Sequence, residues 1–248
     1  MMSVAHHPIS PTAADLRSEL VSLGSPSKAG ELARFFKTAP GQYGAGDHFL
    51  GITVPQQRLL VAKFKDLPLK ETVRLLKENK FHEERLTALL LMVRHFEKAG
   101  NEAARKRVIN GYLSNLKWVN NWDLVDLSAP RILGAWLFDK DRTLLYKLIK
   151  SRVLWERRIA ILASFYFIYH GQSRDALELA EQLLDDREDL LHKATGWMLR
   201  EVGKRVSLAD LRSFLKKHAH RMPRTMLRYA IERLSESERK KWMASQFA

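Results

Sequence analysis

Hydrophobic residues along the chain recur every three or four positions, which is the spacing of an amphipathic α-helix. No segment alternates apolar and polar residues convincingly enough to indicate a β-strand. Many of the apolar stripes follow a Ser or a Pro, residues that commonly begin helices. The pattern predicts an all-α protein with short helices over residues 11–23, 27–38, 55–65, 68–78, 81–98, 101–114, 121–138, 141–150, 153–169, 173–184, 188–203, 207–217, 223–234 and 236–244.

Three of the predicted helices resemble one another in their pattern. Phe81–Ala99, Trp155–Tyr169 and Leu190–Val202 each carry an apolar stripe with charge at its start. Similar short helices joined by short links are typical of stacked antiparallel pairs, as in an α-α superhelix. We therefore expect a solenoid whose concave face suits an extended ligand.

One long irregular stretch, from Thr38 to Val54, interrupts the helices. Loops of this length in compact domains often carry a function, although this one could equally link two helical parts. We expect residues 1–40 to form an N-terminal helical pair. Residues 41–248 should form the repeat solenoid, continuous with that N-terminal part.

Charge and cysteine content narrow the class of protein. The formal charge of +14 and the pI of about 10.0 favour nucleic acid as the partner, or less readily an anionic membrane surface. The absence of cysteine excludes disulfides, thiolate metal sites and a cysteine nucleophile, and it fits a reducing compartment. No signal peptide is evident, and the longest apolar run, Ile159–Tyr169, is about half of the ~20 residues that a membrane span needs. We expect a soluble, intracellular protein, cytoplasmic or associated with the nucleoid if bacterial.

The most informative segment runs from Asn120 to Asp126. It places Trp122 and Asp126 four residues apart, on one face of the predicted helix. An unpaired carboxylate is costly to bury, so this pair would fill a core poorly. The pair suits a positively charged planar or sugar-like group, because the aromatic face offers cation–π attraction and the carboxylate offers negative charge. Because the chain is strongly basic, the pattern indicates that its ligand is a polyanion that also carries a positively charged group.

A second segment places Arg158 three residues after Trp155, on a shared helix face. A guanidinium in this position suits a phosphate, which it can bind through two parallel hydrogen bonds. The structural alternative is an arginine that is paired with Glu156 or with a neighbouring helix, and composition alone slightly favours that alternative.

A third segment aligns three cations and a tryptophan along one stripe of a predicted helix. Cations beside an exposed tryptophan suit a surface that follows phosphates and stacks on bases or sugars. A core tryptophan with solvated neighbours is the alternative, and it is favoured for any isolated tryptophan. Gly196 disfavours helix, which indicates that another part of the chain approaches closely there. The stripe consists of Lys193, Trp197, Arg200 and Lys204.

The C-terminal run from His218 to Arg228 gathers positive charge at a predicted helix start. Positive charge at this end opposes the helix dipole, which is easier to explain if a phosphate binds there. A solvated helix face is an equal alternative. The cations in this run are Arg221, Arg224 and Arg228.

Other catalytic patterns are incomplete. The segment from His82 to Leu86 begins like a zinc-protease helix but lacks the second histidine. His218 and His220 have no evident third ligand, so the sequence indicates no metal site. Neither a Gly-rich phosphate loop nor a serine near a histidine–acid pair is evident.

Four segments together resemble the AlkD-type DNA alkylation repair family, whose members are solenoids of HEAT-like helical repeats that act as DNA glycosylases on alkylpurines. The resemblance extends from about Gly41 to Tyr229. The segments that carry it are Asp47–Ile52, Trp122–Asp126, Arg157–Leu162 and Gly196–Glu201.

The resemblance implies a site and a reaction. By position, Asp126 matches the catalytic carboxylate, and Trp122 and Trp197 match the aromatics beside it. Arg158 matches an arginine near the DNA backbone. The implied reaction is hydrolysis of the N-glycosidic bond of a purine alkylated at N3 or N7, with the carboxylate stabilising an oxocarbenium-like sugar. The implied protein is a monomer that binds double-stranded DNA through its phosphates and the alkylated nucleotide, without a membrane, a metal or an organic cofactor.

A non-catalytic scaffold is the alternative function. Such a protein would have the same HEAT-like repeats and bind nucleic acid or an acidic protein through the same basic concave face. Both functions predict the same DNA-binding cations, namely Lys193, Arg200, Lys204, Arg221, Arg224 and Arg228.

Overall fold

The computed structural model describes residues 11–77 and 80–244. Within these ranges every regular element is helical, apart from one isolated β-bridge between His48 and Phe81. Each of the fourteen predicted helices has a counterpart, so the all-α prediction is confirmed. The chain divides into two compact units, residues 1–124 and 125–248, and helix α7 (Trp122–Ala129) contains the boundary. A superhelix through both units stays a prediction, as do its basic concave face and a domain boundary near residue 40.

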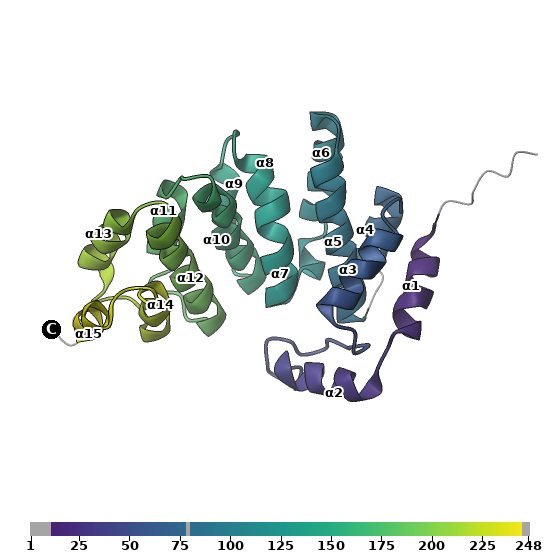
Figure 1. Cartoon of the computed structure of the whole chain (residues 1–248), viewed down its shortest axis with the longest axis horizontal. Coiled ribbons are helices and arrows are strands. Elements are labelled where there is room, and N and C mark those ends of the chain that lie inside the picture. Colours follow the sequence, from purple (N-terminus) through teal and green to yellow (C-terminus); the bar gives the residue numbers. More distant parts are fainter. Residues whose placement is uncertain (1–10, 78–79, 245–248) are drawn as a thin grey trace, which may run out of the picture. The chain divides into compact units, whose positions relative to one another are not determined.

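The first unit is built around α5, a helix that is buried on nearly every side (Figure 1). Its leucines and Met92 have almost no exposed surface, and four other helices pack against it. Burial of this apolar area is the main favourable term in folding. The helices of the unit are α1 (Ala13–Ser22), α2 (Pro26–Phe35), α3 (Val54–Lys63), α4 (Leu69–Lys77), α5 (His82–Lys98) and α6 (Glu102–Leu113), followed by a 3-10 turn at Leu116–Trp118.

Short polar side chains begin several of these helices. The hydroxyl of Thr12 accepts a hydrogen bond from the backbone N–H of Asp15, and the Asp15 carboxylate accepts one from the N–H of Thr12. The Asn101 side chain accepts a hydrogen bond from the N–H of Ala104 at the start of α6. Each of these contacts satisfies a backbone donor that has no partner within its own helix.

The irregular stretch between α2 and α3 is held against the first turn of α5. The carboxylate of Glu83 accepts hydrogen bonds from the backbone N–H groups of Leu50, Gly51 and Ile52 at 2.9, 2.8 and 3.1 Å. Glu83 is buried, and these three donors compensate for the loss of water around its charge. The predicted long loop therefore has a defined path along α5.

The second unit consists of helix pairs in two layers. Helices α10, α12 and α14 pack in succession, while α9 and α11 pack on α10, and α11 and α13 pack on α12 (Figure 1). This arrangement of pairs agrees with the helical repeats that the sequence predicts. The helices are α9 (Thr143–Leu148), α10 (Leu154–Tyr169), α11 (Arg174–Gln182), α12 (Asp189–Arg205), α13 (Leu208–His218), α14 (Arg224–Ala230) and α15 (Glu236–Ala244).

One predicted helix differs in detail from the observed structure. The sequence predicts a single helix over residues 121–138, whereas α7 passes through a π-helical turn at Pro130–Gly134 into the short α8 (Ala135–Leu137). Pro130 has no backbone N–H and its ring crowds the preceding turn, so regular hydrogen bonding cannot continue through it. Among the described residues, no helix is both long and apolar enough to cross a membrane.

Candidate functional site

Asp126 is held by Arg158 in the second unit. Arg158 on α10 donates two hydrogen bonds to the Asp126 carboxylate, from Nε to Oδ1 at 2.9 Å and from Nη2 to Oδ2 at 2.8 Å. Its Nη1 donates to the carbonyl of Leu190 on α12 at 2.5 Å. The Asp126 side chain is only 16% exposed, and the Arg158 side chain only 6%. This bidentate geometry fixes the orientation of both carboxylate oxygens.

The role of Arg158 in the structure corresponds to the structural alternative named above, an arginine paired with a neighbouring helix. Its guanidinium is buried, and the contacts to Asp126 and Leu190 use one hydrogen on each of its three nitrogens. The predicted contact between Arg158 and a DNA phosphate stays a prediction. Such a contact would use the second hydrogens of Nη1 and Nη2, and the phosphate would have to reach a side chain that is only 6% exposed.

Trp197 lies on α12, which packs against α10. Its ring is half-buried, and its centroid is 5.7 Å from that of Phe165 on α10, with the planes tilted by 40°. The neighbouring Gly196 confirms the expected close approach, because a Cβ there would lie 2.4 Å from the carbonyl oxygen of Met226 on α14. Trp197 and Arg158 therefore come from adjacent helices of one unit.

Trp122 belongs to the first unit and starts α7, four residues before Asp126. It is half-buried, and its ring stacks on Phe36 with centroids 5.2 Å apart and planes 14° apart. Phe35 meets the same ring edge-on at 6.0 Å. The sequence prediction did not include either phenylalanine. A single site containing Trp122, Asp126 and Trp197 stays a prediction.

A buried charge cluster, formed by Asp47, His82, Arg85 and Asp123, lies behind Trp122 in the first unit. His82 Nδ1 is 3.1 Å from Asp47 Oδ2, and its Nε2 is 2.8 Å from Asp123 Oδ2. Arg85 Nη2 donates to Asp47 Oδ1 at 2.5 Å. Two carboxylates face two cations, so the cluster is neutral when His82 is protonated, which lowers the cost of burying it.

The carboxylates decide the protonation of His82. Burial by itself lowers the pKa of His82, but the nearby Asp123 and Asp47 raise it to about 9. Burial by itself raises the pKa of Asp47, yet the hydrogen bond from His82 and the charge of Arg85 hold it below its usual value. In the sequence, His82 stands out only as part of an incomplete zinc motif. The nearest signal was the presence of Asp47 and Asp123 in the segments that carry the family resemblance.

The predicted DNA-binding cations all lie in the second unit, and Lys193, Arg200 and Arg221 lie beside carboxylates. Lys193 pairs with Asp189 at 2.7 Å, and Arg221 pairs with Asp185 at 2.9 Å. Exposed pairs of this kind contribute at most about 1 kcal/mol, so a polyanion can compete for these cations. The others are Arg200, which contacts Glu232 and Glu201, and Lys204, Arg224 and Arg228, whose side chains are exposed.

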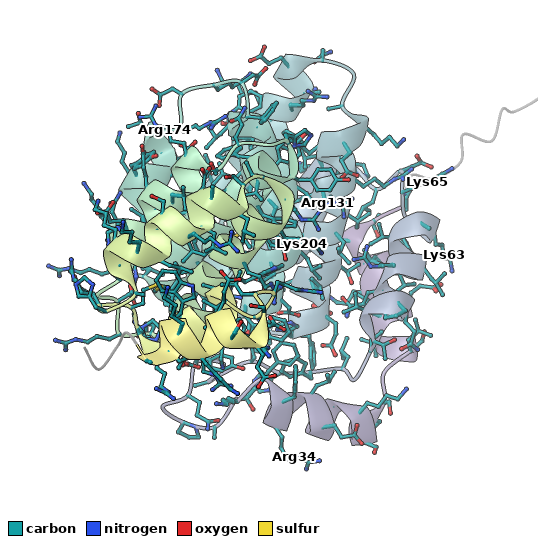
Figure 2. The ribbon with its side chains drawn as sticks, turned by 60° about the vertical axis from the view of Figure 1, so that its left-hand side comes forward. Arg34, Lys63, Lys65, Arg131, Arg174 and Lys204 are labelled. Atoms are coloured by element: carbon teal, nitrogen blue, oxygen red, sulfur yellow. The ribbon has the colours of Figure 1, made fainter. Side chains whose placement is uncertain are left out.

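Figure 2 shows exposed cations on both units. Arg34 and Lys63 of the first unit point outward from their helices, as Arg174 of the second unit does, and Lys65 is exposed in the turn after α3. Positive charge is therefore not confined to the cations that the sequence singled out. Within residues 11–77 and 80–244, no three His, Asp or Glu side chains are grouped as ligands for a metal ion.

Comparison with known proteins identifies the family. A family model described as DNA alkylation repair enzyme matches residues 16–234. The match spans most of the chain, so this protein belongs to the family of DNA alkylation repair enzymes, which gives it a role in DNA repair with DNA as its substrate.

One solved structure supports the fold. The chain is similar to a "predicted DNA alkylation repair enzyme" from Enterococcus faecalis, with a TM-score of 0.66 and 16% sequence identity over 86% of this chain and 97% of that one. At this identity the likeness shows the fold alone. Among curated proteins, none has a matching sequence.

Proposed function

We propose that the protein is a DNA glycosylase that removes purines alkylated at N3 or N7. The observation that carries the proposal is the Asp126–Arg158 pair, in which a bidentate guanidinium fixes the two oxygens of a carboxylate that is 16% exposed. In a family that repairs alkylated DNA, a carboxylate oriented in this way suits a reaction in which positive charge develops on a sugar.

The proposed reaction needs no protonation of the leaving group. A purine alkylated at N3 or N7 is already cationic, so the C1′–N9 bond can break with its electron pair going to the base, which leaves neutral. The sugar becomes oxocarbenium-like, and a water oxygen then bonds to C1′ while its proton passes to solvent or to Asp126. Asp126 stabilises the sugar cation and orients this water.

The neighbouring side chains have separate roles in the proposal. Arg158 is a positioning residue, because it holds Asp126 and is itself anchored by the Leu190 carbonyl. Trp122 and Trp197 offer aromatic faces to the cationic nucleotide. An undamaged purine lacks the positive charge, so it both leaves more slowly and gains less from these groups. This difference supplies the selectivity for damaged bases.

The decisive test is Asp126→Asn, assayed by abasic-site formation in duplex DNA that contains N7-methylguanine. The variant keeps the shape of the side chain but loses the charge, so single-turnover excision should fall by about two to three decades, or roughly 3–4 kcal/mol. DNA affinity should be nearly unchanged, because a carboxylate does not attract a polyanion. Trp197→Ala should be milder, at about 1–2 kcal/mol.

Asp186→Asn is the matched control for this test. Asp186 is held by Arg157, the residue before Arg158, with Nε donating to Oδ2 at 2.7 Å and Nη2 to Oδ1 at 3.4 Å. The control removes the same charge from the same kind of pair in the same unit, and its excision rate should match wild type. If Asp126→Asn also excises at the wild-type rate, a DNA-binding scaffold becomes the better account.

A further inference from the structure

A groove lies between α4 and α6 of the first unit, apart from the candidate site. The two helices lie side by side against α5 (Figure 1), and the cavity between them has a volume of about 700 Å³. A second cavity of about 330 Å³ adjoins it, because Leu69 and Arg107 line both. We call the two together the α4–α6 groove. Of α5 it contacts only the last turn, at Arg94 to Lys98, whereas the charge cluster around His82 lies at the opposite end of that helix.

Six cations line the α4–α6 groove without an ion pair to any residue that the structure describes. They are Lys65, Lys70, Lys77, Arg94, Lys98 and Arg107. Lys70 and Lys77 lie seven positions apart on α4, and Arg94 and Lys98 lie four apart on α5, so like charges share a helix face. Like charges in this arrangement repel one another and weaken a helix. The cluster is easier to explain if the groove meets a negatively charged partner.

The floor of the groove is apolar. Leu69 and Val73 of α4 are half-buried there, and Val108 of α6 is buried. The two helices approach closely at Gly111 on α6, where a Cβ would lie 3.2 Å from Val73 Cγ2. This approach closes the floor beneath the cations. The half-exposed apolar surface that remains is available for a ligand to cover.

Two carboxylates among the cations distinguish between possible partners. Asp66 and Glu71 also line the groove, and Glu71 Oε2 accepts a hydrogen bond from the N–H of Ala13 at 3.2 Å. A nucleic-acid backbone presents negative phosphates, which these carboxylates repel and which gain nothing from an apolar floor. A peptide can present carboxylates, apolar side chains and N–H donors together. The groove therefore fits an acidic peptide better than it fits DNA.

Neither a second copy of this chain nor its undescribed ends match the groove. Residues 1–10 and 245–248 contain no Asp or Glu, and a second copy would bring a further charge of +14. Positive surfaces of this kind repel each other. The charge complementarity points to a different protein.

We propose that the α4–α6 groove binds an acidic amphipathic helix of a partner protein. The apolar face of that helix would cover Leu69 and Val73, as in other complexes in which a helix lies in an apolar groove. Its carboxylates would pair with the cations on both sides, chiefly Lys70 of α4 and Arg107 of α6. The inference does not depend on the glycosylase proposal, because none of these residues takes part in it.

Fluorescence anisotropy with a labelled designed peptide tests the charges. The peptide has leucines spaced three and four positions apart and glutamates at the other positions. Lys70→Gln with Arg107→Gln should weaken its binding about tenfold, since one cation is lost from each side of the groove. The matched control is Lys28→Gln with Arg58→Gln, two exposed cations on α2 and α3 of the same unit. Equal effects of the two double variants, or no binding by the wild type, would overturn the proposal.

Leu69→Gln tests the apolar floor while leaving every charge in place. It should weaken binding of the leucine-containing peptide roughly fivefold and should not change the binding of a poly-glutamate peptide of equal length. Leu59→Gln on α3 is its control, because Leu59 is 72% exposed and lies outside the groove. If Leu69→Gln binds the leucine-containing peptide as wild type does, the floor does not hold a helix and the proposal fails.

Competition with DNA separates the two kinds of polyanion. Unlabelled duplex DNA should not displace the peptide, and the Lys70→Gln, Arg107→Gln variant should bind that duplex as tightly as the Lys28→Gln, Arg58→Gln control does. Displacement of the peptide, together with a selective loss of DNA affinity in the groove variant, would assign the groove to DNA and overturn the proposal. Excision of N7-methylguanine is not measured in any of these experiments, so the glycosylase proposal stands or falls separately.

Discussion

The charge of His82 depends on two carboxylates that lie far from it in the sequence. With a pKa of about 9 in the folded protein and about 6.5 when unfolded, the protonated imidazole stabilises the fold. Its contribution is fully present below pH 6.5 and is lost as the pH rises through 9. The difference corresponds to on the order of 3 kcal/mol.

We expect the wild type to be more stable than His82→Gln at pH 6.5. The difference between their free energies of unfolding should shrink as the pH rises to 9.5. Urea denaturation at several pH values measures this gap. Using the difference between the two proteins removes the titration of groups that they share. His218→Gln should not show this trend, because burial lowers the pKa of His218. Parallel curves for wild type and His82→Gln would contradict the assigned charge.

Among single residues, sequence reasoning proposed Asp126 and Arg158 but not their contact. Helical spacing relates side chains three or four positions apart, whereas these two are 32 positions apart. The sequence left open whether Arg158 is a phosphate ligand or half of an ion pair, and only the tertiary structure brings Asp126 on α7 to it.

At the level of elements, the contact between α12 and α14 depends on a glycine. A Cβ on Gly196 would lie 2.4 Å from the Met226 carbonyl oxygen and 2.5 Å from the Tyr229 Cβ. Gly196→Ala should therefore destabilise the protein by about 1–3 kcal/mol, although alanine favours helix over glycine. The midpoint of urea unfolding measures the change.

Gly30→Ala is the control for this substitution. Gly30 lies in α2 with no atom within 4 Å of the Cβ that it would gain. The same substitution should there raise stability by about 0.5–1 kcal/mol, because alanine loses less backbone entropy on folding. A Gly196→Ala protein as stable as wild type would show that α12 and α14 can separate without cost.

Sequence periodicity located the helices well because it reports which face of each helix is buried. The predicted helix over 153–169 corresponds to α10 within one residue, and 236–244 coincides with α15. The exception at Pro130 has a local cause, the missing backbone N–H. The local sequence does not determine the order in which α10, α12 and α14 pack, because this order depends on how the apolar faces of different helices meet.

For the whole molecule, the charge of +14 predicts DNA binding that depends strongly on salt and little on sequence. Neutralising Arg224 and Arg228, both on α14, to Gln should weaken binding and reduce the slope of log K against log salt by about 2, roughly one unit for each phosphate that the variant no longer neutralises. Titration of a fluorescent duplex at several salt concentrations measures this slope.

Lys147→Gln with Arg174→Gln is the control, since it removes two exposed cations from α9 and α11. This control removes the same number of positive charges as the α14 variant. A general electrostatic effect on DNA binding would therefore appear in both double variants. If the two double variants shift the slope equally, the DNA does not contact Arg224 and Arg228 specifically.

The sequence by itself determined the all-helical class, the helix positions and the family resemblance, because apolar periodicity and short motifs are local properties of a chain. The tertiary structure alone decided which side chains meet. Asp126 acquired a bidentate partner, and Asp47, His82, Arg85 and Asp123 converged from three segments into one neutral cluster. Such contacts form only where packed helices exclude water, since charges in water gain little from pairing whereas buried charges require partners.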